Sequence, residues 1–243
     1  VTSYSSRMKW LPIILASVLL EQRVKHIFVF ISKSEEIPWN LKKFVQENRD
    51  NVSLILTADI RSYKKLYPVI NVEHIALLSE REKVEKYLRD HEVKGVITVD
   101  DDIIYLPGSL MLLIIDPTSI VCSIAHRKNK KIKYRNWSTL RPGKYKAKTA
   151  LAIGAGGVFY PKDFIYSARN YHDGADFELY CPNQDDLWWN LIQTQKNCTV
   201  TVVNTNIIKL DNLLRMKKLS SSNVEDGNDA AIERLLKKWN NFI

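Results

Sequence analysis

The chain is poor in the residues that mark several classes of protein. Glycine is scarce, with 8 among 243 residues, and the absence of internal repeats and low-complexity stretches excludes collagen-like and repeat architectures. The three cysteines are an odd number without metal-ligand spacing. We therefore expect Cys122, Cys181 and Cys198 to be buried thiols in a reducing compartment rather than a disulfide framework.

Long apolar runs are also lacking. The longest one near the N-terminus covers residues 11–20, which is too short for a membrane span, and Glu21 closes it. A signal peptide over residues 7–20 is disfavoured because no small-residue cleavage site follows. The run is better explained as a buried helix, and together with the cysteines it predicts a cytoplasmic protein.

Negative charge is missing from one segment of this basic chain. Lysine and arginine exceed aspartate and glutamate by 36 to 27, which gives a formal net charge of +9. Residues 127–148 contain no acidic residue and ten basic ones: Arg127, Lys128, Lys130, Lys131, Lys133, Arg135, Arg141, Lys144, Lys146 and Lys148. Such a segment is either a solvated surface loop or a site that attracts phosphates, anionic sugars or an anionic membrane. Nucleic acid is not expected, because no zinc-finger, RNP-like or helix-turn-helix signature is present.

Helical and extended patterns alternate over the first two thirds of the chain. Strands are predicted at residues 26–31, 52–56, 94–99 and 120–125, and helices at 9–21, 39–49, 79–90 and 107–115. Ser79 and Glu82 form a capping box, and Pro107 suits a first helical turn. This alternation predicts an α/β fold with a mostly parallel central sheet and helices on both faces.

The last third is less regular. An extended segment at 152–160, a helix near 185–195, a strand at 199–203 and a helix near 229–240 are predicted. We expect one domain over residues 1–243, with a ligand-binding half at 1–105 and a second half at 106–243 that faces a second substrate. Val1 and Thr2 leave little strand ahead of Ser3, so the first strand is expected to be short or to continue upstream.

Three consecutive carboxylates follow the third predicted strand. Crowding Asp100, Asp101 and Asp102 costs free energy unless a cation or hydrogen-bond donors compensate. In open α/β sheets ligands bind beyond the carboxyl ends of strands, where these residues fall. Carboxylates in such a place suit Mn²⁺ or Mg²⁺ bridging the oxygens of a diphosphate. The alternative is a solvated acidic turn.

The run VITVDDDI at residues 96–103 resembles the DXD strand end of GT-A glycosyltransferases, especially the exostosin-like transferases and a group of bacterial polysaccharide glycosyltransferases. Four other segments are similar to elements of these families, in the same order: TSYSSR at 2–7, DIRSYKKL at 59–66, GAGGVFYP at 154–161 and QDDLWWN at 184–190. Ser5 stands where a proline commonly follows the tyrosine. The matches cover nearly the whole chain.

The resemblance implies a GT-A (Rossmann-like) fold. It also implies transfer of a sugar from a nucleoside-diphosphate donor, expected to be a UDP-sugar, to a saccharide or lipid-linked acceptor. Asp102 and Asp100 would hold Mn²⁺ or Mg²⁺, with Asp100 and Asp101 beside the nucleotide-sugar. The other implied contacts of the donor are Thr2, Ser3, Tyr4 and Arg7 at the nucleoside, and Lys64 or Lys65 at the diphosphate.

Gly154, Gly156 and Gly157 are three of only 8 glycines and fall within four positions. This clustering indicates close approach of the backbone to a ligand or positive φ angles, which favours ligand contact by Gly156 and Gly157. A β-bulge is the competing interpretation. The spacing is not a dinucleotide-binding fingerprint, because the G-x-G-x-x-G pattern is absent.

Asp185 and Asp186 precede an aromatic helix. One carboxylate can cap the helix, and by the resemblance Asp186 would be the general base of an inverting transfer. In the retaining exostosin-like relatives the equivalent aspartate has another role, so the sequence leaves the stereochemistry open. A purely capping pair is the alternative. Trp188 and Trp189 are expected to pack in the core, with sugar stacking as the alternative.

Two other functions compete with sugar transfer. Nucleotidyl transfer also uses paired carboxylates on an α/β fold, but it usually shows a glycine- and lysine-rich loop near the first strand, and residues 1–10 have no glycine. A non-enzymatic module could bind nucleic acid or another anionic polymer through residues 127–148. Under the transferase hypothesis, this segment predicts an anionic acceptor or peripheral attachment to the inner face of a membrane.

Overall fold

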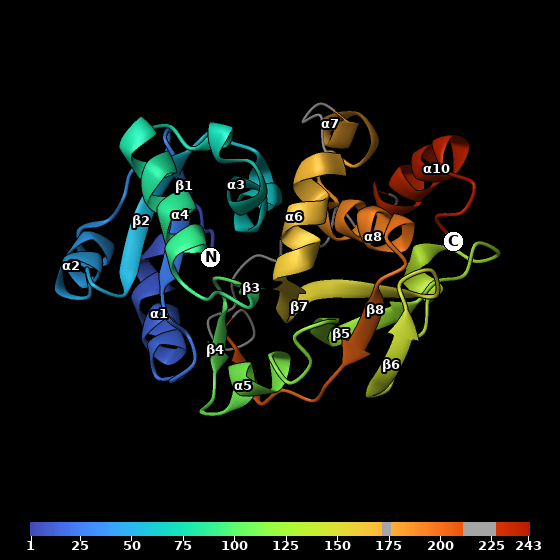
Figure 1. Ribbon diagram of the computed structural model, residues 1–243, viewed down its shortest axis with the longest axis horizontal. Coiled ribbons are helices and arrows are strands. Elements are labelled where there is room, and N and C mark those ends of the chain that lie inside the picture. The colour runs from blue at the N-terminus through green and yellow to red at the C-terminus, as the bar shows by residue number, and fades with distance from the viewer. Residues whose placement is uncertain (172–175, 211–226) are drawn as a thin grey trace.

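The computed structural model describes residues 1–171, 176–210 and 227–243 and shows a mixed α/β fold (Figure 1). The helices of the first half are η1 Ser5–Trp10, α1 Leu11–Leu19, α2 Trp39–Glu47, η2 Arg61–Lys65, α3 Tyr67–Ile70, η3 Val72–His74 and α4 Leu78–Asp90, where η marks a 3₁₀ helix. The later helices are α5 Ser109–Leu113, η4 Tyr134–Asn136, α6 Lys162–Tyr171, α7 Asp176–Tyr180, α8 Asp185–Gln195 and α10 Asn228–Lys238.

The strands form three sheets within the described residues. The strands are β1 Ile27–Ser32, β2 Val52–Thr57, β3 Gly95–Thr98, β4 Ile103–Tyr105, β5 Ile120–Arg127, β6 Gly143–Lys146, β7 Ala150–Pro161, β8 Thr199–Val202 and β9 Ile207–Lys209. β1 pairs with β2 in a parallel sheet, and β4 pairs with β9 in an antiparallel ribbon. The main sheet has the order β3-β7-β5-β8-β6.

The prediction of a mostly parallel central sheet is wrong for this main sheet. β7 lies antiparallel between β3 and β5, and β6 is antiparallel to β8. Only the pairing of β5 with β8 is parallel in it. Period and composition identify a buried strand but not its direction, and β7, from later in the chain, lies between β3 and β5.

Helices cover both faces of the main sheet. Successive side chains of a strand point to opposite faces, so Val121 and Cys122 of β5 enter different cores. Val121 packs in a core with α1 and α5, whereas Cys122 packs in a core with α6, α8 and α10. Figure 1 shows α6 and α8 above the sheet and α5 below it. Both cores combine residues from before and after residue 105.

The tryptophans of α8 belong to the core. Trp188 is 1% exposed and Trp189 is 2% exposed, so neither side chain presents a face to a sugar. Of the cysteines, Cys122 and Cys181 are buried and Cys198 is half-buried, and none of the three forms a disulfide. The prediction of buried thiols is therefore confirmed for two of them. Across the described residues, no helix is both long and apolar enough to cross a membrane.

Two helix starts differ from the prediction. α4 begins at Leu78 after Leu77, whose side chain makes no capping hydrogen bond, so Ser79 and Glu82 do not form a capping box there. α5 begins at Ser109 rather than Pro107, after Gly108 with a φ of 85°. A left-handed residue cannot continue a right-handed helix, so the proline lies outside it.

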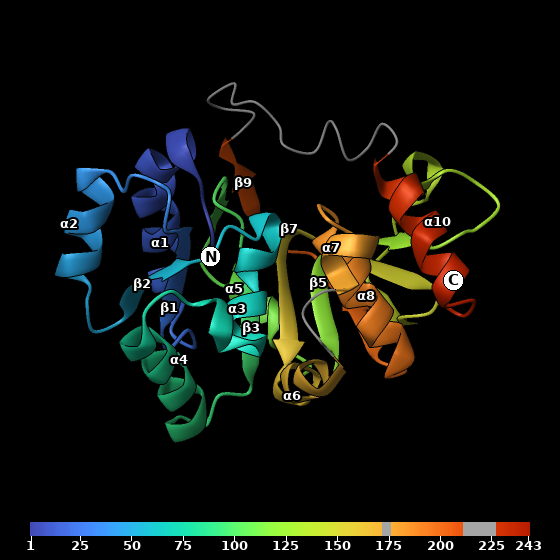
Figure 2. The same ribbon diagram turned by 90° about the horizontal axis from the view of Figure 1, so that it is seen from above.

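The N-terminal residues lie between the β1–β2 sheet and the main sheet. Thr2 bridges Phe30 of β1 in parallel, and the Val1 amino group donates to the Phe28 carbonyl oxygen at 3.0 Å. In both views the N-terminus lies between the β1–β2 sheet and the main sheet (Figures 1 and 2). This placement carries Ser3 and the residues after it toward the carboxyl end of β3, where the aspartates lie.

Candidate active site

One polar cleft of about 750 Å³ gathers segments that are far apart in the chain. It is lined by most of the side chains that the sequence singled out: Thr2, Ser3, Tyr4, Arg7, Lys64, Lys65, Asp100, Asp101, Asp102, Gly154, Asp185 and Asp186. They come from the N-terminal segment, η2, the end of β3, β7 and the start of α8. The cleft therefore brings together all five segments on which the family resemblance is based.

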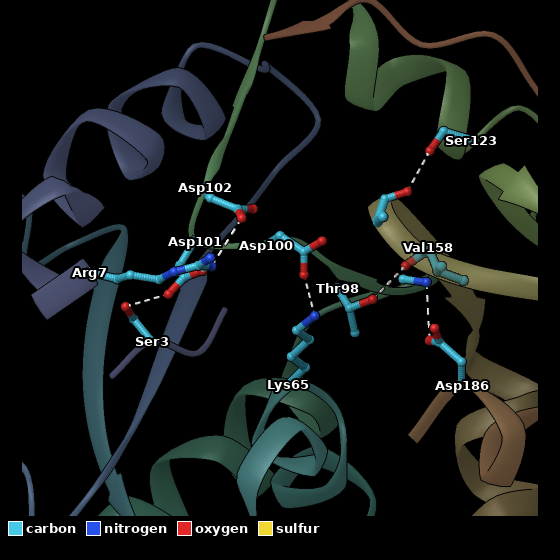
Figure 3. A network of polar contacts seen from close by, with 12 residues as sticks. Ser3, Arg7, Lys65, Thr98, Asp100, Asp101, Asp102, Ser123, Val158 and Asp186 are labelled. Atoms are coloured by element: carbon cyan, nitrogen blue, oxygen red, sulfur yellow. Dashed lines mark hydrogen bonds and ion pairs between the residues drawn. The ribbon is translucent and has the colours of Figure 1, made fainter. Parts of the chain in front are cut away.

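Asp101 is the structural member of the aspartate cluster. Its carboxylate accepts hydrogen bonds from Ser3 Oγ at 2.6 Å and from an Arg7 guanidinium nitrogen at 2.9 Å (Figure 3). Arg7 also donates to Asp102 at 3.0 Å. All of these groups are largely buried, with the Asp102 side chain the most exposed at 20%. Arg7 thus compensates two neighbouring carboxylates and fixes the N-terminal segment against the end of β3.

Asp100 points the other way, toward η2. It forms an ion pair with Lys65 (Figure 3), whereas Lys64 pairs with Asp59 at 2.6 Å. The structure therefore decides which of the two lysines meets the aspartate cluster. Burial alone would lower the pKa of Lys65, but the carboxylates of Asp100 and Asp185 outweigh it and raise the pKa, so this ammonium stays charged.

η2 is held against the turn before α8, which explains how Lys65 reaches both groups of carboxylates. The Tyr63 hydroxyl donates to the Cys181 carbonyl oxygen at 2.6 Å, and Arg61 donates to Asn183 Oδ1 at 2.6 Å. Arg61 has a φ of 54°, an uncommon conformation for a residue other than glycine, at the start of η2. Arg61 lies in the DIRSYKKL segment that carries part of the resemblance, but its positive φ could not be predicted from the sequence, because this conformation depends on tertiary contacts.

Asp186 is held by the backbone of β7. Its Oδ1 accepts a hydrogen bond from the Gly154 N–H at 3.1 Å (Figure 3), and the N-cap residue Gln184 makes no side-chain capping bond. A Cβ atom at Gly154 would lie 3.1 Å from that oxygen and 3.8 Å from Lys65 Nζ. Gly154 therefore allows the backbone to approach both side chains closely.

The two carboxyls of α8 resist ionisation. Burial, and then the negative charge of Asp185, raise the pKa of Asp186 to about 8, while Lys65 and the Gly154 N–H oppose the change. Burial also raises the pKa of Asp185, against the effect of Lys65. A carboxyl group with a pKa near neutrality can take up and release a proton at physiological pH, which suits a general base.

Gly156 and Gly157 have a different role from Gly154. Both have positive φ, 86° and 96°, at the shift in register between β5 and β7. A Cβ at Gly156 would meet Ser123 Oγ at 2.2 Å, and one at Gly157 would meet Leu113 at 2.8 Å. Within the described part of the chain, neither lines the cleft. The predicted ligand contact by these two glycines is not supported, and the bulge explains them.

A second set of side chains lines the same cleft and was largely missed from the sequence. His126, Tyr134 and Trp137 supply rings, and Arg135 supplies a positive charge. The Asp229 carboxylate accepts the Tyr134 N–H at 2.7 Å, which fixes η4 against the start of α10. The signal in the sequence was the mixture of basic and aromatic residues in the 127–148 segment, together with the Asn228-Asp229 pair.

The carboxylates of the cleft suit one kind of metal site. Among the described residues, no group of three or more His, Cys, Asp or Glu side chains could hold a metal ion. Asp100 and Asp102 each offer a carboxylate at the cleft, and each also pairs with a cation of the chain. Mg²⁺ is commonly bound through one or two carboxylates, with phosphate oxygens and water completing its shell. The residues therefore fit an ion that binds together with a diphosphate rather than a preformed cage.

Comparison of the sequence with protein-family models finds no match, and comparison with curated proteins finds no significant similarity.

Proposed function

We propose that this protein is a metal-dependent glycosyltransferase that moves a sugar from a nucleoside diphosphate, with UDP as the expected nucleotide, to a saccharide or lipid-linked acceptor. One observation carries the proposal. A single cleft holds Asp100–Asp102, Lys65, the segment at residues 2–7 and the raised-pKa carboxyl of Asp186. An acidic cluster for a metal diphosphate and a base for a hydroxyl are the two parts that such a transfer requires.

The donor end of the cleft is the aspartate cluster. We assign Asp102 and Asp100 to Mn²⁺ or Mg²⁺, which when bound with the diphosphate would neutralise the charge of the leaving group. Lys65 offers an ammonium group next to Asp100, where it can contact a phosphate oxygen. Tyr4 and Ser3 line the same end through the segment that Arg7 fixes, which supports a nucleoside pocket there.

The acceptor end is the start of α8. We assign Asp186 as the general base of an inverting transfer. The acceptor oxygen would attack the anomeric carbon, the bond from that carbon to the β-phosphate oxygen would break, and the nucleoside diphosphate would leave. The hydroxyl proton would pass to Asp186, whose raised pKa makes the ionised form a stronger base than an exposed carboxylate. Asp185 raises that pKa further through its charge.

We also propose the GT-A type for the fold. The parallel β1–β2 sheet with its helices, followed by an aspartate cluster after β3 and a mostly antiparallel second part, supports this assignment. The cleft lies where these parts meet, since its lining residues come from both. The assignment depends on the motif resemblance, because strand order alone is shared by proteins of unrelated function.

The direct test is calorimetry with UDP, GDP, ADP and CDP, each with and without Mn²⁺. We expect one diphosphate to bind in a metal-dependent way to the wild type, and Asp102→Asn to lose the metal-dependent part of the affinity. Asp90→Asn is the matched control, because Asp90 is an exposed aspartate of α4 that pairs only with its exposed neighbour Arg89 among the described residues. The proposal fails if no diphosphate binds, or if the affinity is changed neither by Mn²⁺ nor by Asp102→Asn.

A further inference from the structure

One end of the cleft combines rings with a positive charge. The rings of His126 and Tyr134 lie 5.9 Å apart, and those of Tyr134 and Trp137 lie 5.2 Å apart. The Trp137 indole N–H donates to the Asn129 carbonyl oxygen at 2.9 Å, so the cluster is held by the backbone. Trp137 is almost fully buried, whereas Tyr134 is half-buried and offers part of its ring to the cleft. A fixed aromatic face suits the apolar face of a sugar ring.

Arg135 carries the charge at this end. It is exposed, lines the cleft and makes no ion pair with any described residue, in contrast to the aspartates of the donor end. Burial lowers the pKa of His126, so the imidazole is neutral at pH 7 and adds no charge. The whole segment 127–148 lacks an acidic residue. Guanidinium groups bind carboxylates and phosphates in a bidentate way.

We infer that this end of the cleft binds an acceptor saccharide that carries an oxyanion, a phosphate or a carboxylate, with the anion at Arg135 and the sugar ring against Tyr134. The inference rests on the proposed function, because it names the acceptor of the same cleft. It accounts for Arg135 in a cleft that also holds the aspartate cluster: a metal diphosphate would meet the aspartates, and an anionic acceptor would meet Arg135.

The 127–148 segment is not a uniform basic face of the kind that lies on a membrane. Lys128 is buried and donates to Asn190 Oδ1 at 2.9 Å, and Lys144 pairs with Asp116 at 2.7 Å. Arg135 lines a cleft rather than a flat surface. A concave site with rings and one cation selects a small ligand over a bilayer, so the observations favour the saccharide.

The test uses three sugars of similar size, glucose, glucose 6-phosphate and glucuronate, titrated into the full chain with UDP and Mn²⁺ present. We expect the wild type to bind the two anionic sugars about tenfold more tightly than glucose, because a hydrogen bond to a charged group contributes that much. Arg135→Gln should abolish the preference and leave UDP affinity unchanged. Arg141→Gln is the matched control, since Arg141 is exposed in the same segment but is not among the described residues that line the cleft.

Three results would overturn the inference: equal binding of the three sugars, an equal loss in Arg141→Gln and Arg135→Gln, or binding of the wild type to phosphatidylserine vesicles with no preference among the sugars. Comparison of glucose 6-phosphate with glucuronate shows whether a phosphate or a carboxylate is preferred. Failure of the wild type to bind any diphosphate with Mn²⁺ would instead overturn the proposed function. Equal sugar binding with intact UDP binding would overturn only the anionic acceptor.

Discussion

Two hollows of similar size in the described part of the structure differ in chemistry. The polar cleft of about 750 Å³ is lined by charged side chains at the ends of strands and helices. The other, the apolar hollow of about 600 Å³, is lined mainly by apolar side chains, among them Phe28, Val96 and Phe159, but also by charged ones such as Glu21, Lys25 and Glu92. Volume therefore does not identify the candidate site. Convergent charged groups and a carboxyl with a displaced pKa do, because such arrangements cost stability and are found where chemistry needs them.

Lys65 lines both hollows. Its ammonium group pairs with Asp100 in the polar cleft, and its aliphatic stem accounts for its place in the wall of the apolar hollow. The comparison predicts that substitutions in the two hollows have different effects. Substitutions in the polar cleft should change ligand binding or catalysis and leave the fold intact, and substitutions in the apolar hollow should do the reverse.

The largest effect is expected from Asp186→Asn. Loss of a general base should lower the rate of sugar transfer roughly 10²- to 10⁴-fold while UDP affinity stays the same. In the wild type the rate should fall with decreasing pH below about 8, since the base must be ionised and its pKa is raised to about 8. Initial rates measured across pH would check both statements. An undiminished rate in Asp186→Asn, with Asp90→Asn as control, would remove Asp186 from catalysis.

The same substitution should stabilise the fold at high pH. The folded protein keeps a proton on Asp186 up to about pH 8, whereas the unfolded chain releases it near pH 4, so stability is lost as pH rises through this window. Asp186→Asn should remove this loss of stability, because asparagine does not ionise. Thermal unfolding at pH 8 should show a midpoint a few degrees above that of the wild type, and at pH 4 the two midpoints should converge. A lower midpoint at pH 8 would contradict the raised pKa.

Phe159→Ala tests the apolar hollow. Phe159 is 2% exposed and belongs to the core formed with α1 and α5. Truncation should lower the free energy of unfolding by roughly 3–5 kcal/mol, measured by urea titration, without changing UDP affinity in the molecules that remain folded. Phe159→Leu, which keeps most of the volume, should lose less. Weaker UDP binding with unchanged stability would break the division between the two hollows.

Two glycines of β7 should fail in different ways. Gly154→Ala places a methyl group against Asp186 and Lys65, so the transfer rate should fall roughly tenfold with little loss of stability, as expected when a catalytic group is displaced. Gly156→Ala forces an alanine into the positive φ that Gly156 adopts and creates a clash with Ser123, so it should cost roughly 1–3 kcal/mol of stability. Measuring the transfer rate and the urea midpoint of both variants would show whether Gly154 acts in the cleft and Gly156 in the bulge. Equal changes of rate and stability in the two variants would contradict these different roles.

The smallest effect is expected outside both hollows. Lys144 pairs with Asp116 at 2.7 Å, but the lysine side chain is 67% exposed. Lys144→Gln should therefore change the free energy of unfolding by less than about 1 kcal/mol, and the difference should shrink in high salt. The hydrogen bond from Lys144 lowers the pKa of Asp116, so any contribution is lost as the pH falls toward that pKa. A large change that persists in high salt would show that the pair is more than a surface contact.

Much of the secondary structure could be predicted from the sequence. The strands β1, β2, β3 and β5 and the helix α8 lie within one or two residues of their predicted ranges. Period and apolar composition report local burial, and these segments have a strong pattern. β4, β6 and β9 and the helices α6 and α7 were not predicted. The three strands are at most four residues long and α7 has five residues, too few to show a period, whereas α6, with ten residues, was missed.

The sequence by itself also determined which residues to examine, since twelve of the residues it singled out line one cleft. Only the tertiary structure decided how they divide. It directed Lys65 rather than Lys64 to Asp100, buried Asp101 against Arg7, assigned Gly156 and Gly157 to a bulge and inserted β7 antiparallel between β3 and β5. The reason is distance along the chain. A pattern of residues reports the local backbone and its burial, whereas strand direction and ion pairs depend on distant partners, which for the Lys65–Asp100 and Arg7–Asp101 pairs lie 35 and 94 positions away.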